Sequence, residues 1–269
     1  MVELIVVTVL GSLVVMAALQ VLITNQRTYS AQSAVISGQQ STRMAVEVLF
    51  AELREVSASG GDIIAMSSDS LRVRLMRKFS VVCETILTGQ PRLLVLDSLG
   101  SLSINAAANA FDVGDSVFIY ADNNPNDNDD DVWIEARVTA VDLTVTCPQN
   151  GEGAMELRFN GQASLFNADS VGIGAPVRSY LQYTFGIATM LGDSYLGRRV
   201  GNGDMIPIAG PLRAGDGLEF EYRDALGTVT AVPADVRMIV VTIRTGSTVL
   251  NSLGEMVSDS ITVWVYARN

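Results

Sequence analysis

The sequence predicts an α+β protein in which one long N-terminal α-helix, about residues 1–57, packs against a β-rich globular head. Two observations support this fold class. The first 25 residues are an apolar, almost uncharged run that continues without a break into an amphipathic segment. After Gly61, short runs alternate between apolar and polar residues with the two-residue period of half-buried β-strands. One helix followed by strands indicates that the helix covers one face of a sheet.

Residues 1–25 form the hydrophobic half of the predicted helix. No charged residue and no proline lies between Leu4 and Asn25. At 1.5 Å per residue this stretch is about 33 Å long, close to the thickness of the hydrocarbon core of a bilayer. A cleavable signal peptide has a basic start and a shorter apolar core of about 7–15 residues, and this run has neither feature. We therefore expect a membrane span or anchor that stays on the protein.

Residues 26–57 form the amphipathic half of the helix. Between Arg27 and Val56 there is no proline, and Gly38 is the only glycine. Four apolar residues recur at spacings that place them on one face of a helix: Ala45, Leu49, Leu53 and Val56. Gly60 and Gly61 then supply a helix stop, because glycine adopts the left-handed conformation without steric cost. This half is expected to pack against its own head.

The predicted head covers residues 62–269 and reads as β throughout. Candidate strands occupy residues 71–76, 92–96, 116–120, 132–141, 155–159, 177–183, 218–223, 236–245 and 261–266. The run 237–243 (RMIVVTI) is apolar on both faces, so we expect a central, covered strand beneath the amphipathic helix. A division of the head near residues 151–174, where glycines cluster, is an alternative to a single domain.

Composition narrows the possible functions. A net charge of −11 would repel nucleic-acid phosphates, so no nucleic-acid partner is predicted. The chain has no histidine, which removes Ser-His-Asp and Cys-His catalysis and the usual mixed zinc sites. We predict a protein that is not an enzyme and has no catalytic residue. The two cysteines, Cys83 and Cys147, either form a disulfide in an oxidising compartment or are unpaired buried thiols.

A stretch rich in Asp and Asn, residues 122–131, is the most unusual polar segment. Oxygen ligands at two-residue spacing are typical of calcium loops, which makes calcium a candidate cofactor. The candidate ligands are Asp122, Asn124, Asn126, Asp127, Asp129 and Asp131. The EF-hand pattern fails, because Asp127 stands where glycine is needed and Trp133 where the bidentate glutamate belongs. The alternative is a solvated turn between two strands, since Asn, Asp and Pro favour turns.

The N-terminal residues resemble those of a known family. Residues 1–7 (MVELIVV), with Glu3 ahead of an unbroken apolar helix, are similar to type IV pilins and pseudopilins. Residues 26–29 and 43–54 resemble PilW-like minor pilins, and residues 208–212, 217–224 and 234–237 resemble the end of those chains. In that family an aromatic and a small hydroxyl residue usually precede the position of Met1. Either two residues are missing before Met1, or Met1 is itself the processed end.

The resemblance implies a structural subunit of a type IV pilus or pilus-like filament. The helix would be held in the bacterial inner membrane as a single span and later packed in the core of a periplasmic or extracellular filament. Glu3 would pair with the N-terminal amine, on Met1, of a neighbouring subunit. Gly11 and Gly38 are candidates for close helix packing, although Gly11 can also simply be tolerated in a membrane segment. The implied partners are other copies or other pilins, the inner-membrane assembly machinery, and the membrane before assembly.

Several alternatives stay open within and beyond this family. The PilW-like resemblance favours a minor, tip or priming role, while a main filament subunit and a type II secretion pseudopilin are also consistent with the sequence. The alternative from a different class is a membrane-tethered β-domain with binding or enzymatic activity. A plain tether needs neither a carboxylate at the start of its helix nor an amphipathic continuation, and this chain has both.

Overall fold

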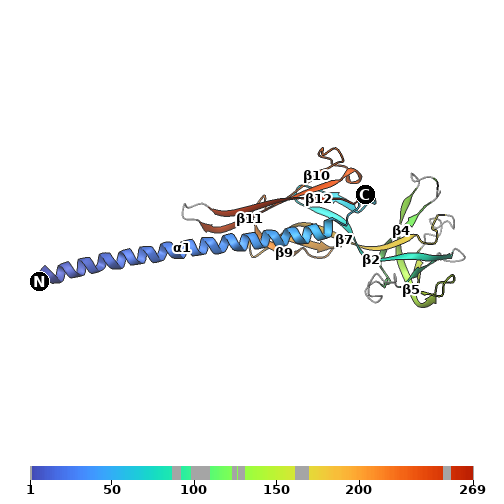
Figure 1. Ribbon diagram of the computed structural model, residues 1–269, viewed down its shortest axis with the longest axis horizontal. Helices are drawn as coiled ribbons and strands as arrows, with labels where there is room; N and C mark the ends of the chain where they lie inside the picture. Colours follow the sequence, from blue (N-terminus) through green and yellow to red (C-terminus); the bar gives the residue numbers. More distant parts are fainter. Residues whose placement is uncertain are drawn as a thin grey trace. The chain divides into compact units, whose positions relative to one another are not determined.

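The protein is described by a computed structural model over residues 2–86, 92–97, 110–122, 126, 131–160, 170–250 and 256–268. A long helix, α1 (Val2–Leu53), precedes the β-strands (Figure 1). The strands are β1 (Ile63–Met66), β2 (Leu71–Ile86), β3 (Arg92–Leu96), β4 (Ser116–Ala121), β5 (Val132–Thr146), β6 (Gly153–Phe159), β7 (Pro176–Met190), β8 (Asp193–Val200), β9 (Ile206–Leu212), β10 (Leu218–Arg223), β11 (Met238–Leu250) and β12 (Met256–Tyr266), with a 3-10 turn, η1 (Pro233–Asp235), before β11. This α+β architecture confirms the predicted fold class.

The described chain divides into two compact units. Met1–Arg72 together with Thr184–Asn269 forms one, here called the helix unit, and Val73–Tyr183 forms the other, the barrel unit. The chain passes from one unit to the other inside β2 and inside β7. The segment predicted as one head, residues 62–269, therefore holds two units, and the division does not lie near residues 151–174. Sequence patterning did not reveal it, because β2 and β7 alternate without interruption across the boundary.

Helix α1 ends four residues before the predicted stop at residue 57. After Leu53 the chain forms a turn in which the backbone N–H of Val56 donates to the carbonyl of Leu53, three residues earlier, at 3.1 Å. The carbonyl of Val56 accepts a hydrogen bond from the N–H of Arg268 at 2.8 Å, and Ser57 forms a parallel bridge with Arg268. These residues join the C-terminal strand region, which is why the helix does not continue to the glycines.

The sheet of the helix unit is centred on β11. Strand β12 pairs antiparallel along one edge of β11, and β10 pairs along the other edge from Met238 to Ile243. Farther along that second edge, Thr245 pairs with Leu212 of β9, which in turn pairs with β8. The register places alternate residues of β11 on two faces: Ile239, Val241, Ile243 and Thr245 on the inner face, and Met238, Val240, Thr242 and Arg244 on the outer face.

Helix α1 covers the inner face of this sheet. It lies along β9, β11 and β12 (Figure 1), and a Cβ added at Gly38 would lie 3.2 Å from Oγ1 of Thr245. The predicted apolar stripe of the helix is fully buried: Ala45, Leu49, Leu53 and Val56. The sequence correctly predicted a central strand beneath the helix. It was wrong about the second face, because Met238 and Val240 on the outer face are only partly covered.

The barrel unit is a six-stranded sheet that closes on itself. Neighbouring strands follow the order β2-β3-β6-β5-β4-β7, and β2 also pairs with β7. At the closure, the N–H of Val82 donates to the carbonyl of Ala175 at 2.9 Å, and the N–H of Gly174 donates to the carbonyl of Val82 at 2.7 Å. Apolar side chains from all six strands, including Phe159, Met155 and Ile119, pack inside as one core. The interior is thus filled by side chains, as expected for a small barrel.

Candidate functional site

The N-terminal half of α1 is exposed on every side. No residue from Val6 to Ser30 is buried, and large apolar residues in the first half of this stretch, such as Val7, Leu13 and Met16, are 57–68% exposed. Among the described residues, α1 is the helix that is long and apolar enough to cross a membrane. A continuous apolar surface of this kind is stable only in surroundings that exclude water. The exposed half is therefore the first candidate functional surface.

Glu3 lies in the first turn of this exposed half, and its side chain is exposed. The next charged residue along the helix is Arg27. A carboxylate in the first turn complements the positive end of the helix dipole, which favours it at this position. Met1, the predicted source of the pairing amine, lies outside the described residues. The pairing between subunits remains a prediction.

The C-terminal half of α1 is attached to its own sheet by polar contacts as well as by the apolar stripe. The hydroxyl of Ser41 donates to the carbonyl of Gly210 at 2.8 Å. Glu52 and Arg198 form an ion pair at 3.4 Å. Gly38 faces Thr245 of β11, so the structure places this predicted packing residue against the subunit's own sheet. Gly11 has open space around it, with nothing within 4 Å of an added Cβ.

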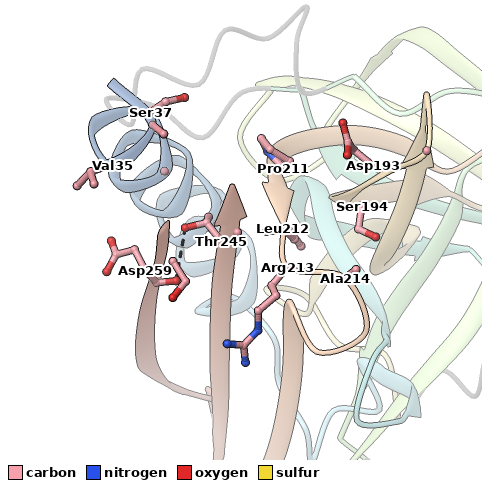
Figure 2. Close-up of a pocket in the computed structure, with 15 residues that line it drawn as sticks. Val35, Ser37, Asp193, Ser194, Pro211, Leu212, Arg213, Ala214, Thr245 and Asp259 are labelled. Carbon is pink, nitrogen blue, oxygen red and sulfur yellow. Dashed lines mark hydrogen bonds between the residues drawn. The ribbon is translucent and has the colours of Figure 1, made fainter. Parts of the chain in front are cut away.

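A pocket of about 480 Å³ lies between α1 and strands β8, β9, β11 and β12 (Figure 2). It is lined by Ala34, Val35, Ser37, Gly38, Gly192, Asp193, Ser194, Pro211, Leu212, Arg213, Ala214, Thr245, Gly246, Ser258 and Asp259. Its one arginine, Arg213, is already paired with Asp216. The sequence did not predict this pocket, because its walls come from five segments that are far apart along the chain. Its described lining residues are mixed polar and apolar, and among them there is no arrangement typical of a nucleophile and its base.

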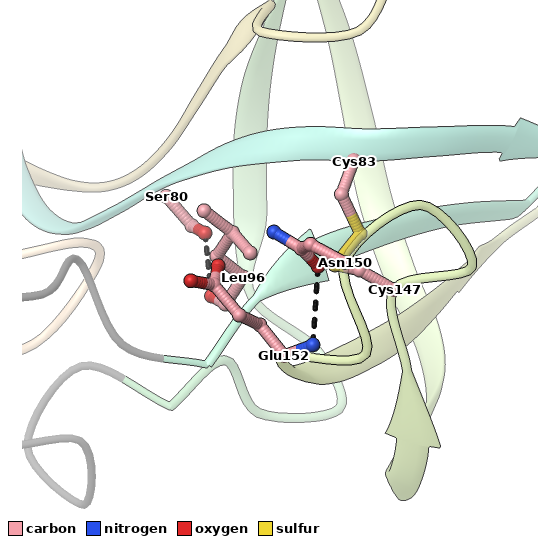
Figure 3. Close-up of a disulfide and its surroundings, with 6 residues drawn as sticks. All are labelled: Ser80, Cys83, Leu96, Cys147, Asn150 and Glu152. Atoms are coloured by element: carbon pink, nitrogen blue, oxygen red, sulfur yellow. Dashed lines mark hydrogen bonds between the residues drawn. A yellow bond between two sulfur atoms is a disulfide. The ribbon is translucent and has the colours of Figure 1, made fainter.

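The two cysteines are joined in a disulfide within the barrel unit (Figure 3). Cys83 lies on β2, and Cys147 follows directly after β5, 64 residues later in the chain. Both are buried and pack with Leu94 and Ala154 in a small apolar cluster. The turn after Cys147 is closed by the N–H of Cys147, which donates to the carbonyl of Glu152 at 2.8 Å. This burial suits a structural cross-link.

The acidic stretch lies only partly within the described residues. Asp122, Asn126 and Asp131 are described, whereas Asn124, Asp127 and Asp129 lie outside. The N–H of Asp122 donates to the carbonyl of Ser170 at 2.8 Å, at the end of β4. Within the described ranges, no group of three or more His, Cys, Asp or Glu could hold a metal ion. Calcium binding by this stretch remains a prediction.

Sequence reasoning missed a cluster of arginines and aromatic rings on the barrel unit. The guanidinium of Arg178 lies 4.9 Å from the ring centre of Phe118 and 4.6 Å from that of Trp133. The hydroxyl of Tyr180, beside Phe118, donates to the carboxylate of Glu135. Burial, and then this hydrogen bond, raise the pKa of Tyr180 to about 12. The phenol therefore stays neutral at ordinary pH, and the cluster stabilises the barrel wall.

The chain was compared with models of protein families, with curated proteins and with solved structures. None of the three comparisons found a match.

Proposed function

We propose that this chain is a structural subunit of a type IV pilus or pilus-like filament. The observation that carries the proposal is the division of α1 into an exposed apolar half that begins with a single carboxylate and a half packed onto a β-sheet. The long helix and β-rich head agree with the pilin-like architecture that the sequence resemblance implies. On this proposal the helix is held in the bacterial inner membrane as a single span and is later transferred to the filament core.

The transfer is reasonable in free energy because both environments exclude water. Burying one Val, Leu or Met side chain is worth about 1.5–3 kcal/mol. The exposed half of α1 has more than ten such side chains, among them Val7, Leu13 and Leu22. Neither bilayer nor filament core leaves them in water, so moving between the two does not lose this stabilisation. The helix can thus leave the membrane only into another apolar environment, such as the packed helices of other subunits.

Glu3 supplies the specificity of assembly in this proposal. A carboxylate within a bilayer is unfavourable by about 2.5–3.5 kcal/mol near the centre and less toward the interface. In the water-free core of a filament, the N-terminal amine of a neighbouring subunit would neutralise it. Such a pair fixes the axial position of one helix against the next, because a displaced helix would leave both charges buried and unpaired.

The pairing residue also separates this proposal from a plain tether. A tethered β-domain would gain nothing from a carboxylate in the first turn of its span. It would also not need the span to continue, without a break, into the helix that covers β9, β11 and β12. The PilW-like resemblance supports a minor, tip or priming role, and a main filament subunit or a type II secretion pseudopilin would use the same helix.

The test is a Glu3→Ala variant expressed in the native host. We expect membrane insertion to be unchanged, because removal of a charge makes the span more apolar. Removing one partner of a buried ion pair destabilises the assembly by about 3–5 kcal/mol, so incorporation into filaments should fall by about two to four orders of magnitude. Membrane fractionation and imaging of sheared filaments measure the two quantities separately.

The matched control is Glu152→Ala, the same substitution in an exposed turn of the barrel unit. It should leave both insertion and filament yield unchanged. Normal filaments assembled from the Glu3→Ala chain would refute the role proposed for Glu3. A plain tether predicts instead that neither the parent chain nor the variant is found in filaments, and that outcome would refute the filament proposal.

A further inference from the structure

The outer face of the β10–β11–β12 sheet carries two exposed aromatic side chains. Trp264 is 59% exposed and Tyr266 is 72% exposed, and both lie on β12. The chain contains two tryptophans, so one of them is presented largely to solvent. Exposed aromatic residues that gather on one surface mark an interaction site more often than isolated exposed residues do. The neighbouring residues indicate the kind of ligand that would fit this surface.

The two rings form one continuous apolar surface with residues of β11. Trp264 is directly opposite Val240 and Tyr266 directly opposite Met238 in the antiparallel register. Val240 and Met238 are partly exposed, so all four side chains contribute to the same patch. Residues two apart on a strand are about 7 Å apart, which places the two aromatic side chains next to each other on the same face of β12. We call these four residues the aromatic face.

Hydrogen-bonding groups border the aromatic face on the same side of the sheet. On β10, Glu221 is opposite Val240 and forms an ion pair with Arg223. Next to them Glu219 pairs with Arg244 at 2.7 Å. The hydroxyls of Thr242 and Thr262 lie 3.0 Å apart, two residues from Val240 on β11 and two residues from Trp264 on β12.

These bordering groups have two properties that describe the ligand. The two glutamates and two arginines cancel in charge, although the whole chain has a net charge of −11. The surface is therefore not built to attract a polyanion or a polycation. The carboxylates, guanidinium groups and hydroxyls nevertheless have more donor and acceptor positions than these contacts use. The ligand should be uncharged, with one flat apolar side and many hydroxyl groups.

We propose that the aromatic face binds a neutral polysaccharide. The flat C–H side of a sugar ring carries weak positive charge and packs on the electron-rich face of Trp264 or Tyr266. The ring hydroxyls of the sugar then point outward and reach Glu221, Thr262 and their neighbours. Two aromatic rings along one strand suit consecutive sugars of an extended chain better than a single small molecule.

The position of the aromatic face favours a ligand from outside the filament. Helix α1 lies on the inner face of the sheet, as the contact between Gly38 and Thr245 shows. The aromatic face is on the opposite side of the same strands. If α1 packs in a filament core, which rests on the proposed function above, the aromatic face points away from the other subunits. A second copy of the chain is then a poorer candidate than a ligand in the medium.

The experiment is sedimentation of the purified full chain with insoluble cellulose, chitin and β-mannan, in a detergent without a sugar head group. We expect retention on at least one of these neutral polysaccharides. Trp264→Ala and Tyr266→Ala should each weaken binding by about tenfold, and the double variant by more. The matched control is Tyr29→Ala, because Tyr29 is 75% exposed but lies on α1. It should bind as the parent chain does.

A second measurement does not depend on the stability of the alanine variants. In a Trp133→Phe chain, Trp264 is the single tryptophan, and its emission should change on addition of a soluble oligosaccharide of the polysaccharide that is retained. Trp264→Tyr should keep most of the binding, because it keeps a ring at the same place. Failure to sediment with any of the three polysaccharides, binding unaffected by the double variant, or binding to heparin or lipid vesicles alone would each overturn the proposal.

The two proposals can fail separately. Binding is measured on the purified chain, which needs no filament, whereas assembly is measured on the Glu3 variant in cells. The Trp264→Ala, Tyr266→Ala chain should still assemble. Absence of the parent chain from filaments would remove the filament proposal without changing the sedimentation result.

Discussion

Removing the disulfide between Cys83 and Cys147 should destabilise the barrel unit and leave the helix unit intact. The cross-link joins residues 64 apart in the sequence, and both lie in Val73–Tyr183. In the chain-entropy treatment, a cross-link that closes a loop of this length stabilises the fold by restricting the unfolded chain. Its removal should lower the free energy of unfolding by about 4 kcal/mol at 25 °C. Both cysteines are buried, at 8% and 1% exposure, so Ala is a better replacement than Ser because it adds no buried hydroxyl.

The assay compares urea unfolding of the parent chain, the reduced parent and the Cys83→Ala, Cys147→Ala chain. The two tryptophans report on different units, since Trp133 lies in the barrel unit and Trp264 in the helix unit. Single-tryptophan variants separate their signals, and hydrogen exchange along β6 and β11 gives an independent measure for each unit. We expect the Trp133 transition and the β6 amides to lose stability while the β11 amides do not.

Two results would refute this reasoning. A loss below about 1 kcal/mol would mean that the cross-link does not constrain the unfolded chain as the entropy treatment requires. An equal loss of protection in β6 and β11 would mean that the two units unfold as one. The reduced parent serves as the control for the substitutions, because it lacks the cross-link but keeps both side chains.

Two smaller predictions concern a turn and a buried phenol. Leu191 and Gly192 join β7 to β8 with φ of 55° and 92°, as in a type I′ turn. This left-handed conformation is unfavourable for Leu by about 1–2 kcal/mol. Leu191→Asn should therefore raise the Tm by about 2–4 °C. Leu226→Asn, equally exposed but without positive φ, is the control, and a matching rise there would contradict the argument. Because the folded-state pKa of Tyr180 is raised from 10.0 to about 12, its neutral form stabilises the fold fully below about pH 10, and this contribution is lost as pH rises toward 12. Tyr180→Phe should remove that loss in urea unfolding followed up to pH 12, and unchanged pH dependence would count against the assigned role.

Much of the fold could be predicted from local pattern. The helix, its apolar stripe and most of the strands follow from periodicity, because each depends on residues that are near one another in the chain. The sequence did not predict β1, β8 or β9. The stripe of Ala45, Leu49 and Leu53 is fully buried as expected. The pairing of Cys83 with Cys147 was one of two alternatives that the composition left open, and the structure contains the disulfide.

The candidate sites were less predictable. Glu3 could be predicted as a candidate site residue, because the sequence itself shows a single charge in an apolar run. The pocket beside Gly38 could not be predicted, because it forms only when α1, β8, β9, β11 and β12 come together. The prediction that both faces of β11 are covered was correct only for the inner face, for the same reason. An apolar run such as residues 237–243 shows that a strand can be buried on two faces, but not whether a second layer is present to bury both.

The sequence alone therefore determined, for most segments, which form helix and which form strands, and it showed the apolar half of the helix with its carboxylate. Both follow from backbone preference and hydrophobic period, which are local properties. Long-range pairing decided the rest. The closure of β2 against β7 makes a barrel out of strands that, in the sequence, look no different from those of an open sheet. The register of β12 against β11 places Trp264 and Tyr266 on the side of the sheet opposite α1. A shift of one residue would have buried them, and no local pattern determines which register forms.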